Sequence, residues 1–353
     1  MGVITWNGSA STDYGTDANW SSGSVPSASS NVVIPDTSSI NNCILDTART
    51  VNSFRIDSGG TFDGDGNLLT VDSEGDATTG ASEGFAVNID GIISGTDTDI
   101  AITTPATTDI DLAATSGSIR NLIINHASCV AQMKSDVSLS GNLTITAGQL
   151  TTGISGFGFS NLTVAGTTTI GPNSGAADQA TLTCNASTVS LGASETSSYA
   201  LRITQGGTFT GGTGTHTIGS LEMVNNAAAK CTLTSGVTTI SSERTSADNH
   251  LVIGSSTTFA HGSGTITTTF AGTTHMDVDK TLNNLTINHA SAVHKLSDSL
   301  DLAGNLTITA GDFKPNGRNL TVAGDVSVTG TLTGSSGAMS FGSLSVASGG
   351  TYN

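Results

Sequence analysis

The chain is poor in charged and aromatic residues. Of its 353 residues, 11 % are charged and 4 % are aromatic, whereas about 25 % of the residues in an ordinary globular protein are charged. Intrinsic disorder combines low hydrophobicity with high charge, and here 36 % of the residues are hydrophobic. With so few large side chains, small aliphatic residues must fill the interior. We therefore expect an ordered protein built from stacked strands.

Cysteines and basic residues are scarce as well. The four cysteines, Cys43, Cys129, Cys184 and Cys231, are dispersed without a CxxC pair, which disfavours both a disulfide framework and a zinc site. Eleven Lys and Arg against 28 Asp and Glu give a net charge of −17, and such a field would repel a nucleic-acid backbone. We therefore expect no nucleic-acid partner.

Several sequence signals are missing. No apolar run approaches the ~18 residues that a membrane helix requires, and the start of the chain lacks the basic and apolar regions of a secretory signal. No catalytic signature or cofactor-binding motif is visible either. We therefore expect no membrane insertion, no enzymatic activity and no cofactor, apart from a calcium ion considered below.

An internal repeat is the most informative feature that the chain does have. Residues 120–171 and 283–330 are two copies of one block, each with NLTITAG and then NLTVAG after a loop. Apolar residues fall at every second position, as in Leu143 and Ile145, which is the period of strands with one face inward. A sandwich or barrel does not usually repeat its own sequence. We predict an all-β fold, a right-handed parallel β-helix (β-solenoid) of about 20–25 residues per coil, with the duplicated blocks in the section 120–353.

Two pairs of matched positions in the repeat indicate structural roles. Cys129 aligns with Ala292, and a position that accepts Cys or Ala is typical of a small apolar core site. His126 and His289 occupy the same position in the sequence NHAS of each copy. A catalytic histidine is seldom duplicated together with its whole block, so we interpret both as structural turn residues.

The N-terminal segment 1–40 is expected to close one end of the solenoid. A solenoid end exposes unpaired strand edges and apolar interior, and therefore needs a cap. Trp6, Tyr14 and Trp20 cluster in this segment, which contains both tryptophans of the chain. Aromatic side chains suit burial over an open end and also docking into a partner. We interpret the segment as a cap or an attachment module.

Residues 41–119 are expected to form an acidic first section of the solenoid. Between Asp57 and Asp111 there are twelve Asp and Glu and no Lys or Arg. An acidic, solvated edge would prevent a long β surface from pairing with its neighbours, and this is the interpretation that we favour. The alternatives are carboxylates that bind cations, or an acid and base pair in a glycan-cleaving enzyme.

One turn in this section partly matches a calcium-binding loop. Asp63, Asp65, Asn67 and Glu74 stand at positions 1, 3, 5 and 12 of such a loop. Position 6 should be glycine but is Leu68, which begins a stretch that reads as another strand. The turn therefore has two interpretations, a calcium site with these four ligands or a solvated Asp/Gly turn between coils.

The repeated NLTITAG and NLTVAG strands, separated by Gly- and Ser-rich turns, resemble the Ser/Thr/Gly-rich β-solenoid proteins of tailed bacteriophages and of some bacterial surfaces. The opening segment, with Trp6, Asn19, Trp20 and Pro26, is similar to one that begins such chains. The resemblance implies a non-enzymatic virion component, either a fibre or a capsid decoration protein, that offers an elongated surface for attachment. A tailspike-like polysaccharide depolymerase and a fragment of a bacterial adhesin or autotransporter passenger are the alternatives.

The implied partners and location follow from the same resemblance. We expect contacts with other virion proteins of the capsid or tail, a host-surface glycan as ligand, and assembly in the host cytoplasm. The adhesin alternative would instead place the chain outside the cell or on its surface. Three parallel copies packed side by side would bury the weakly charged Ser/Thr faces, so we expect a homotrimer. Residues 348–353 match residues 58–63, which a further strand follows, so we expect a longer chain or another subunit to complete the last coil.

Overall fold

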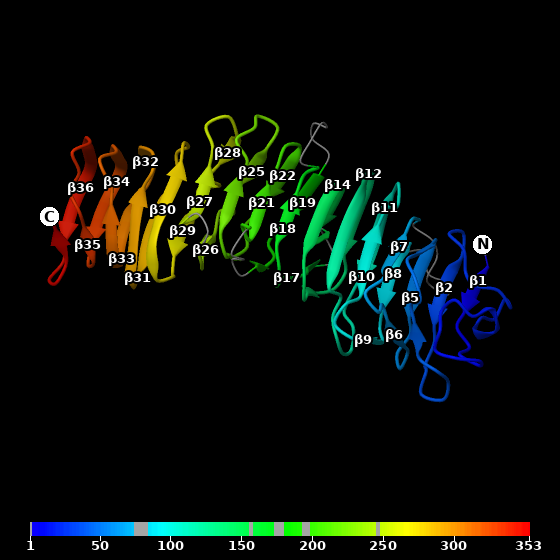
Figure 1. Ribbon diagram of the computed structural model, residues 1–353. Coiled ribbons are helices and arrows are strands. Elements are labelled where there is room, and N and C mark those ends of the chain that lie inside the picture. The colour runs from blue at the N-terminus through cyan, green and yellow to red at the C-terminus, as the bar shows by residue number, and fades with distance from the viewer. Residues whose placement is uncertain (1, 74–83, 155–157, 173–179, 193–197, 245–247) are drawn as a thin grey trace. The chain divides into compact units, whose positions relative to one another are not determined.

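The computed structural model describes the chain except for residues 1, 74–83, 155–157, 173–179, 193–197 and 245–247. The regular secondary structure of the described part is almost entirely strand (Figure 1), with one short 3₁₀ helix, η1 (Asp17–Asn19). The chain divides into two compact units, Met1–Ala165 with Gln179–Leu182, and Gly166–Asp178 with Thr183–Asn353. Among the residues described, no helix is long and apolar enough to cross a membrane.

The strands of the first unit are β1 (Val3–Thr5), β2 (Asn31–Ile34), β3 (Cys43–Ile44), β4 (Arg49–Val51), β5 (Ser53–Ile56), β6 (Thr61–Asp63), β7 (Leu68–Val71), β8 (Phe85–Ile89), β9 (Ile92–Ser94), β10 (Asp99–Ile102), β11 (Thr107–Asp111), β12 (Asn121–Met133), β13 (Val137–Leu139), β14 (Leu143–Thr151), β15 (Gly153–Ile154), β16 (Gly158–Phe159) and β17 (Leu162–Val164). Strand β19 (Ala180–Thr183) lies at the division between the two units.

The strands of the second unit are β18 (Thr168–Ile170), β20 (Val189–Leu191), β21 (Leu201–Ile203), β22 (Gly207–Thr210), β23 (His216–Ile218), β24 (Leu221–Met223), β25 (Lys230–Thr232), β26 (Val237–Ile240), β27 (Asn249–Ile253), β28 (Thr258–Ala260), β29 (Thr265–Thr268), β30 (Gly272–Val278), β31 (Asn284–Leu296), β32 (Leu300–Leu302), β33 (Leu306–Lys314), β34 (Leu320–Val328), β35 (Thr331–Leu332), β36 (Met339–Val346) and β37 (Thr351–Tyr352).

Successive coils pair through parallel strands, which places equivalent side chains in columns. In the first unit, β10 pairs with both β7 and β12, and the register aligns Leu69, Ile100 and Leu122. In the second unit, β31 pairs with β33 and aligns Leu285 with Leu306. None of these five side chains is exposed, and burying each one contributes about 1.5–3 kcal/mol. The predicted parallel β-solenoid is confirmed.

The first strands of the two repeated blocks fold in the same way. β12 and β31 have identical patterns of buried and exposed residues along their thirteen positions. Cys129 and Ala292, which align in the repeat, are each 1 % exposed, so the prediction of a small apolar core site is confirmed. Phe159, in the loop by which the first copy is longer, is 50 % exposed.

Asparagine side chains join neighbouring coils at the start of the NLT strands. The Oδ1 of Asn121 accepts a hydrogen bond from the backbone N–H of Asn142 at 2.7 Å. In the second block, Oδ1 of Asn284 accepts from the N–H of Asn305, and Oδ1 of Asn305 accepts from that of Asp325, both at 2.8 Å. These bonds satisfy turn N–H groups that the strand ladders leave unpaired. We refer to them as the asparagine ladder.

The ladder requires glycine immediately before the residue whose N–H donates, as at Gly304 before Asn305 and Gly324 before Asp325. A Cβ at Gly304 would meet the Oδ1 of Asn284, and a Cβ at Gly324 would meet the Oδ1 of Asn305. A larger residue would therefore displace the amide that holds the two coils together. This contact explains why the repeat reads Gly-Asn or Gly-Asp at these turns.

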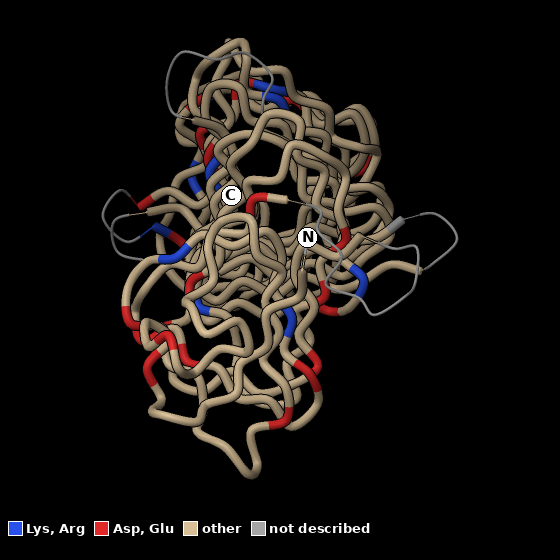
Figure 2. Tube along the Cα trace, turned by 90° about the vertical axis from the view of Figure 1, so that its right-hand side faces the viewer, with Lys and Arg blue, Asp and Glu red and all other residues tan. Residues whose placement is uncertain are grey.

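Charged side chains are sparse, and acidic ones predominate (Figure 2). Two carboxylates of the acidic section pair with cations that lie further along the chain. Arg120 donates through Nε and Nη2 to the two oxygens of Asp99, at 2.8 and 2.7 Å. Nζ of Lys134 lies 2.9 Å from Asp109. These two aspartates therefore join successive coils through partly buried ion pairs, a role not expected for them from the sequence.

Candidate functional site

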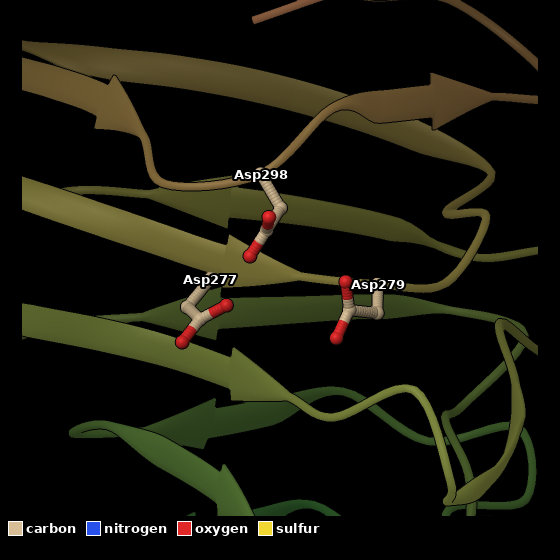
Figure 3. A group of neighbouring side chains, drawn as sticks. All are labelled: Asp277, Asp279 and Asp298. Carbon is tan, nitrogen blue, oxygen red and sulfur yellow. The ribbon is translucent and has the colours of Figure 1, made fainter.

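Three aspartates of the second unit form a group of potential metal ligands within the described part of the chain. Asp277 is in β30, Asp279 follows that strand, and Asp298 lies in the turn after β31. One oxygen from each of the three lies within 4.8 Å of the others, and the side chains face a common space (Figure 3). Asp277 and Asp298 are partly buried, whereas Asp279 is exposed.

The electrostatics of this group follow from its like charges. Burial, a hydrogen bond with Asp298, and the charges of Asp298 and Asp279 raise the pKa of Asp277 to about 6. Sharing a proton between Asp277 and Asp298 relieves part of the repulsion. Such an arrangement can hold a hard cation through oxygen ligands, or can present a carboxylic acid beside a carboxylate. The sequence analysis missed this group because Asp298 lies one coil away from the other two.

Trp6, Tyr14 and Trp20 form a buried aromatic cluster in the N-terminal segment. They are 1 %, 0 % and 2 % exposed. The ring of Trp20 lies edge-on to those of Trp6 and Tyr14, with centroids 5.0 and 4.6 Å apart. The indole N–H of Trp20 donates to the carbonyl of Tyr14 at 2.8 Å, and that of Trp6 donates to the carbonyl of Asn41 at 2.7 Å. These contacts place the three rings in the interior of the segment, and its role as a cap stays a prediction.

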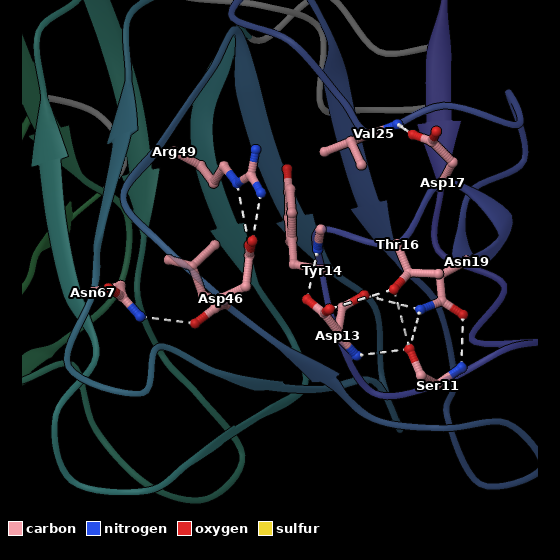
Figure 4. Close-up of polar contacts among 12 residues, drawn as sticks. Ser11, Asp13, Tyr14, Thr16, Asp17, Asn19, Val25, Asp46, Arg49 and Asn67 are labelled. Atoms are coloured by element: carbon pink, nitrogen blue, oxygen red, sulfur yellow. Dashed lines mark hydrogen bonds and ion pairs between the residues drawn. The ribbon is translucent and has the colours of Figure 1, made fainter.

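Polar contacts fix the loop around these rings (Figure 4). The buried side chain of Asn19 accepts hydrogen bonds from the N–H groups of Ala10 and Ser11 and donates to the carbonyl of Asp13. The guanidinium of Arg49 lies 5.6 Å from the centre of the Tyr14 ring. A docking surface on this segment would have to use side chains other than the three aromatic ones. The attachment role of residues 1–40 stays a prediction.

The turn between β6 and β7 contains three of the four predicted calcium ligands. The Oδ1 of Asp63 accepts from the N–H of Asp65 at 2.9 Å, and the side-chain amide of Asn67 donates to the carbonyl of Leu45 at 2.8 Å. These bonds are those of a turn between coils, and the strand expected after it is β7. The fourth predicted ligand, Glu74, lies outside the described residues. Calcium binding by this turn stays a prediction.

His126 and His289 form equivalent local hydrogen bonds in the two copies, but they lie within the strands β12 and β31 and not in the turn predicted from the repeat. In each copy, the imidazole Nδ1 accepts a hydrogen bond from the N–H two residues further on, Ser128 or Ser291, at 3.2 Å. The two side chains therefore support equivalent bends within β12 and β31.

A pair of buried histidines occupies the interior of the second unit. Nδ1 of His250 and Nδ1 of His294 each lie 2.9 Å from the hydroxyl oxygen of Thr274. That hydroxyl can donate its proton to only one of them, so the two rings must carry different tautomers while both are neutral. Their Nε2 atoms are buried without a hydrogen-bond partner. Burial lowers the pKa of His294 to about 4 and that of His250 well below its usual value.

Comparisons with known proteins add no further constraint on the site. No family model, no curated protein and no solved structure matches this chain. The fold assignment therefore depends on the strand arrangement, and the resemblance to phage and surface proteins stays a prediction.

Proposed function

We propose that the chain is a non-enzymatic structural component of a phage virion, a β-helical fibre or capsid decoration protein that offers a surface for attachment. The observation that supports this proposal is the repeated coil itself. Both blocks bury the same aliphatic positions, and the NLT strands turn Thr toward solvent, as Thr163 and Thr321 do. A repeated coil presents the same type of surface many times. Such a surface suits multivalent attachment better than catalysis in a single pocket.

The partners of this proposal are capsid or tail proteins, further copies of the chain, and a glycan on the host surface. Faces of Ser and Thr carry few charges to desolvate, and parallel copies could bury them where their hydroxyl groups form hydrogen bonds across the interface. A homotrimer assembled in the host cytoplasm and incorporated into the virion is the arrangement that we favour.

Two measurements test this proposal. Light scattering coupled to size-exclusion chromatography should give three times the mass of the chain, 35.2 kDa. Gold-labelled antibodies against the chain should mark viral particles in lysates of producing cells. Labelling of the bacterial envelope instead of particles would contradict the virion assignment and would favour the adhesin or autotransporter alternative. A monomeric mass would contradict the trimer.

A polysaccharide depolymerase is the second candidate, because Asp277 combines a raised pKa with a neighbouring carboxylate. Retaining glycosidases place two carboxyl groups about 5–5.5 Å apart and keep one of them protonated. If the group formed by Asp277, Asp279 and Asp298 were catalytic, the protein would release reducing ends from host capsule, and Asp277→Asn would abolish the release. Asp301→Asn, which changes an exposed carboxylate in β32, is the matched control. No release by the unchanged protein would eliminate this candidate.

A further inference from the structure

The chain contains two Asn-Gly pairs, Asn7–Gly8 and Asn316–Gly317. Asparagine is chemically labile, and an asparagine that precedes glycine reacts most readily with its own backbone. Glycine has no side chain to hinder the approach of its nitrogen to the side-chain carbonyl carbon of the asparagine. By sequence the two pairs are equivalent. The structure places them in different surroundings, and these surroundings decide which asparagine reacts.

Asn316 and Gly317 form a turn between β33 and β34. Both residues are exposed, and both have a positive φ, 55° and 81°. A Cβ built at Gly317 would meet the Oγ of Ser336 at the ordinary contact distance of 3.6 Å. The side-chain amide of Asn316 donates a long hydrogen bond, 3.4 Å, to the carbonyl of Leu296. The amide is therefore weakly held, and the turn leaves room for it to move toward the Gly317 nitrogen.

Asn7 and Gly8 lie in a tightly packed part of the N-terminal segment. Gly8 is buried and Asn7 is half-buried. A Cβ at Gly8 would meet the carbonyl oxygen of Asn41 at 2.6 Å and the Nε1 of Trp6 at 2.8 Å. The Oδ1 of Asn7 accepts a hydrogen bond from the N–H of Ser9 at 3.1 Å, and the carbonyl of Gly8 accepts one from the Asn41 amide at 2.6 Å. The reaction would have to break these contacts, so the fold protects this pair.

A hydrogen bond from the neighbouring coil restrains the nitrogen of the exposed pair. The N–H of Gly317 donates to the Oγ of Ser335 at 2.9 Å. The same Oγ accepts from the N–H of Gly337 at 3.1 Å. Because the Gly317 nitrogen attacks only after it loses its proton, the bond to Ser335 stabilises the unreactive form. The neighbouring coil therefore slows the reaction without excluding it.

We propose that Asn316 is a site of spontaneous deamidation. The Gly317 nitrogen gives its proton to solvent and forms a bond to the Cγ of Asn316. The bond between Cγ and Nδ2 breaks, and ammonia leaves after taking a proton from water. The product is a five-membered succinimide. Water then adds to one of the two carbonyl carbons of the ring and breaks the bond from that carbon to the nitrogen, which gives aspartate or isoaspartate.

The reaction changes both the charge and the length of this turn. Each product carries a carboxylate where Asn316 has a neutral amide, and it no longer donates to the carbonyl of Leu296. Isoaspartate also lengthens the backbone by one carbon atom, in a turn that Ser335 of the neighbouring coil holds. We therefore expect this junction between coils to weaken as the protein ages.

Peptide mapping by mass spectrometry during storage of the chain in neutral buffer tests the proposal. In the folded protein Asn316 should deamidate about tenfold or more faster than Asn7, because Asn7 reacts only when its packing opens. In denaturant the two should react at similar rates. Isoaspartate should appear beside aspartate, because only the succinimide route forms it. Asn316→Gln is the control, since glutamine would have to close a six-membered ring, and it should stop the conversion.

Two serine variants test the restraint by the neighbouring coil. Ser335→Ala removes the acceptor of the Gly317 N–H. It should speed the deamidation of Asn316 about fivefold, the factor that corresponds to about 1 kcal/mol. Ser299→Ala is the matched control, because it removes a hydroxyl that accepts from the N–H of Asn319 at 3.2 Å. It should leave the rate unchanged.

The proposal would be overturned by absent conversion of Asn316, or by a rate no higher than that of Asn7 in the folded protein. Aspartate without isoaspartate at position 316 would also overturn it, because direct hydrolysis of the amide would then be the route. An equal acceleration in the two serine variants would overturn the restraint assigned to the Ser335 hydroxyl.

Discussion

The imidazole rings of His250 and His294 lie 4.7 Å apart between centroids, and neither side chain is exposed to solvent. Phe270 contacts both rings edge-on, at 5.1 and 5.2 Å. The two histidines are therefore buried where a positive charge would lose the stabilisation that water gives it. The charge of the neighbouring His275 adds to the depression of the His250 pKa.

Acid should destabilise the fold through these histidines. Their pKa values are lowered in the folded state and normal in the unfolded chain, so only the unfolded chain takes up their protons between pH 6.5 and about 4. The free energy of unfolding should therefore fall as the pH falls through this window, by about 3 kcal/mol for a shift of the size found at His294. Denaturant unfolding at a series of pH values measures it.

The variant His294→Leu should reduce this pH dependence but not abolish it, because burial also lowers the pKa of His250 and lowers that of His216 to about 4. His289→Asn is the control, because His289 supports a bend by accepting one backbone hydrogen bond and is not buried. A pH profile for His294→Leu that runs parallel to that of the unchanged protein would show that other groups cause the acid sensitivity.

Removing a bond of the asparagine ladder should lower the free energy of unfolding. Asn284→Ala removes the acceptor for the N–H of Asn305 and should cost about 1 kcal/mol. Gly304→Ala should cost about 1–3 kcal/mol, because its Cβ would meet the Oδ1 of Asn284. The double variant should cost less than the sum, since the first change removes the atom with which the second collides. Chemical denaturation of the four proteins gives the coupling.

Asn226→Ala provides the comparison for this cycle. Asn226 accepts a hydrogen bond from the N–H of Ala228 within its own turn, so this change should add to Gly304→Ala without coupling. Equal coupling in both cycles would argue against a specific bond between Asn284 and the next coil.

Removing the charge of Asp277 should stabilise the protein at neutral pH. Because the pKa of Asp277 is raised to about 6 in the folded state, its contribution to stability is lost as the pH rises from 3.8 through 6. Asp277→Asn should therefore raise the unfolding midpoint at pH 7.5 and have little effect at pH 3.5. Thermal unfolding followed by circular dichroism tests this, with Asp301→Asn as the control. A lower midpoint at pH 7.5 would mean that the carboxylate itself is needed, as it would be in a bound-cation site.

The four cysteines should be inert in the folded protein. All are free and buried, and burial raises the pKa of Cys129 to about 11, so little of its reactive thiolate forms at neutral pH. A thiol reagent should label none of them until denaturant is added. Cys129→Ala should cost less than about 1.5 kcal/mol, because the equivalent position already carries Ala292. Rapid labelling of the native protein would contradict the packing described for these sites.

The coil was predictable from the sequence because its cause is local. Alternation of Leu and Ile with polar residues in NLTITAG fixes which side of a strand faces inward, and the repeat fixes that strands stack. The bend around His126 was expected as a turn, but β12 runs through it as one strand with irregular register beside Asn125. The compact units divide near residue 165, and the three sections expected from composition stay a prediction.

The sites were not predictable, because their residues meet only through the register between coils. Ser335 reaches Gly317, and Asp298 reaches Asp277, from one coil to the next. Coil length varies with the loops, so counting along the sequence does not identify the partner. The composition between Asp57 and Asp111 predicted an acidic, solvated edge. Asp99 and Asp109 of this section instead form ion pairs with cations further along the chain.

The asparagine ladder also bears on how such a chain changes over generations. Each ladder bond joins one coil to the next, and the same bond recurs in both copies of the block. Duplication or loss of the DNA that encodes one whole coil would therefore leave every remaining junction chemically unchanged. Insertions of a few codons inside a strand would instead shift Asn out of reach of its neighbour. Heritable variation in length is thus expected to occur in steps of a coil.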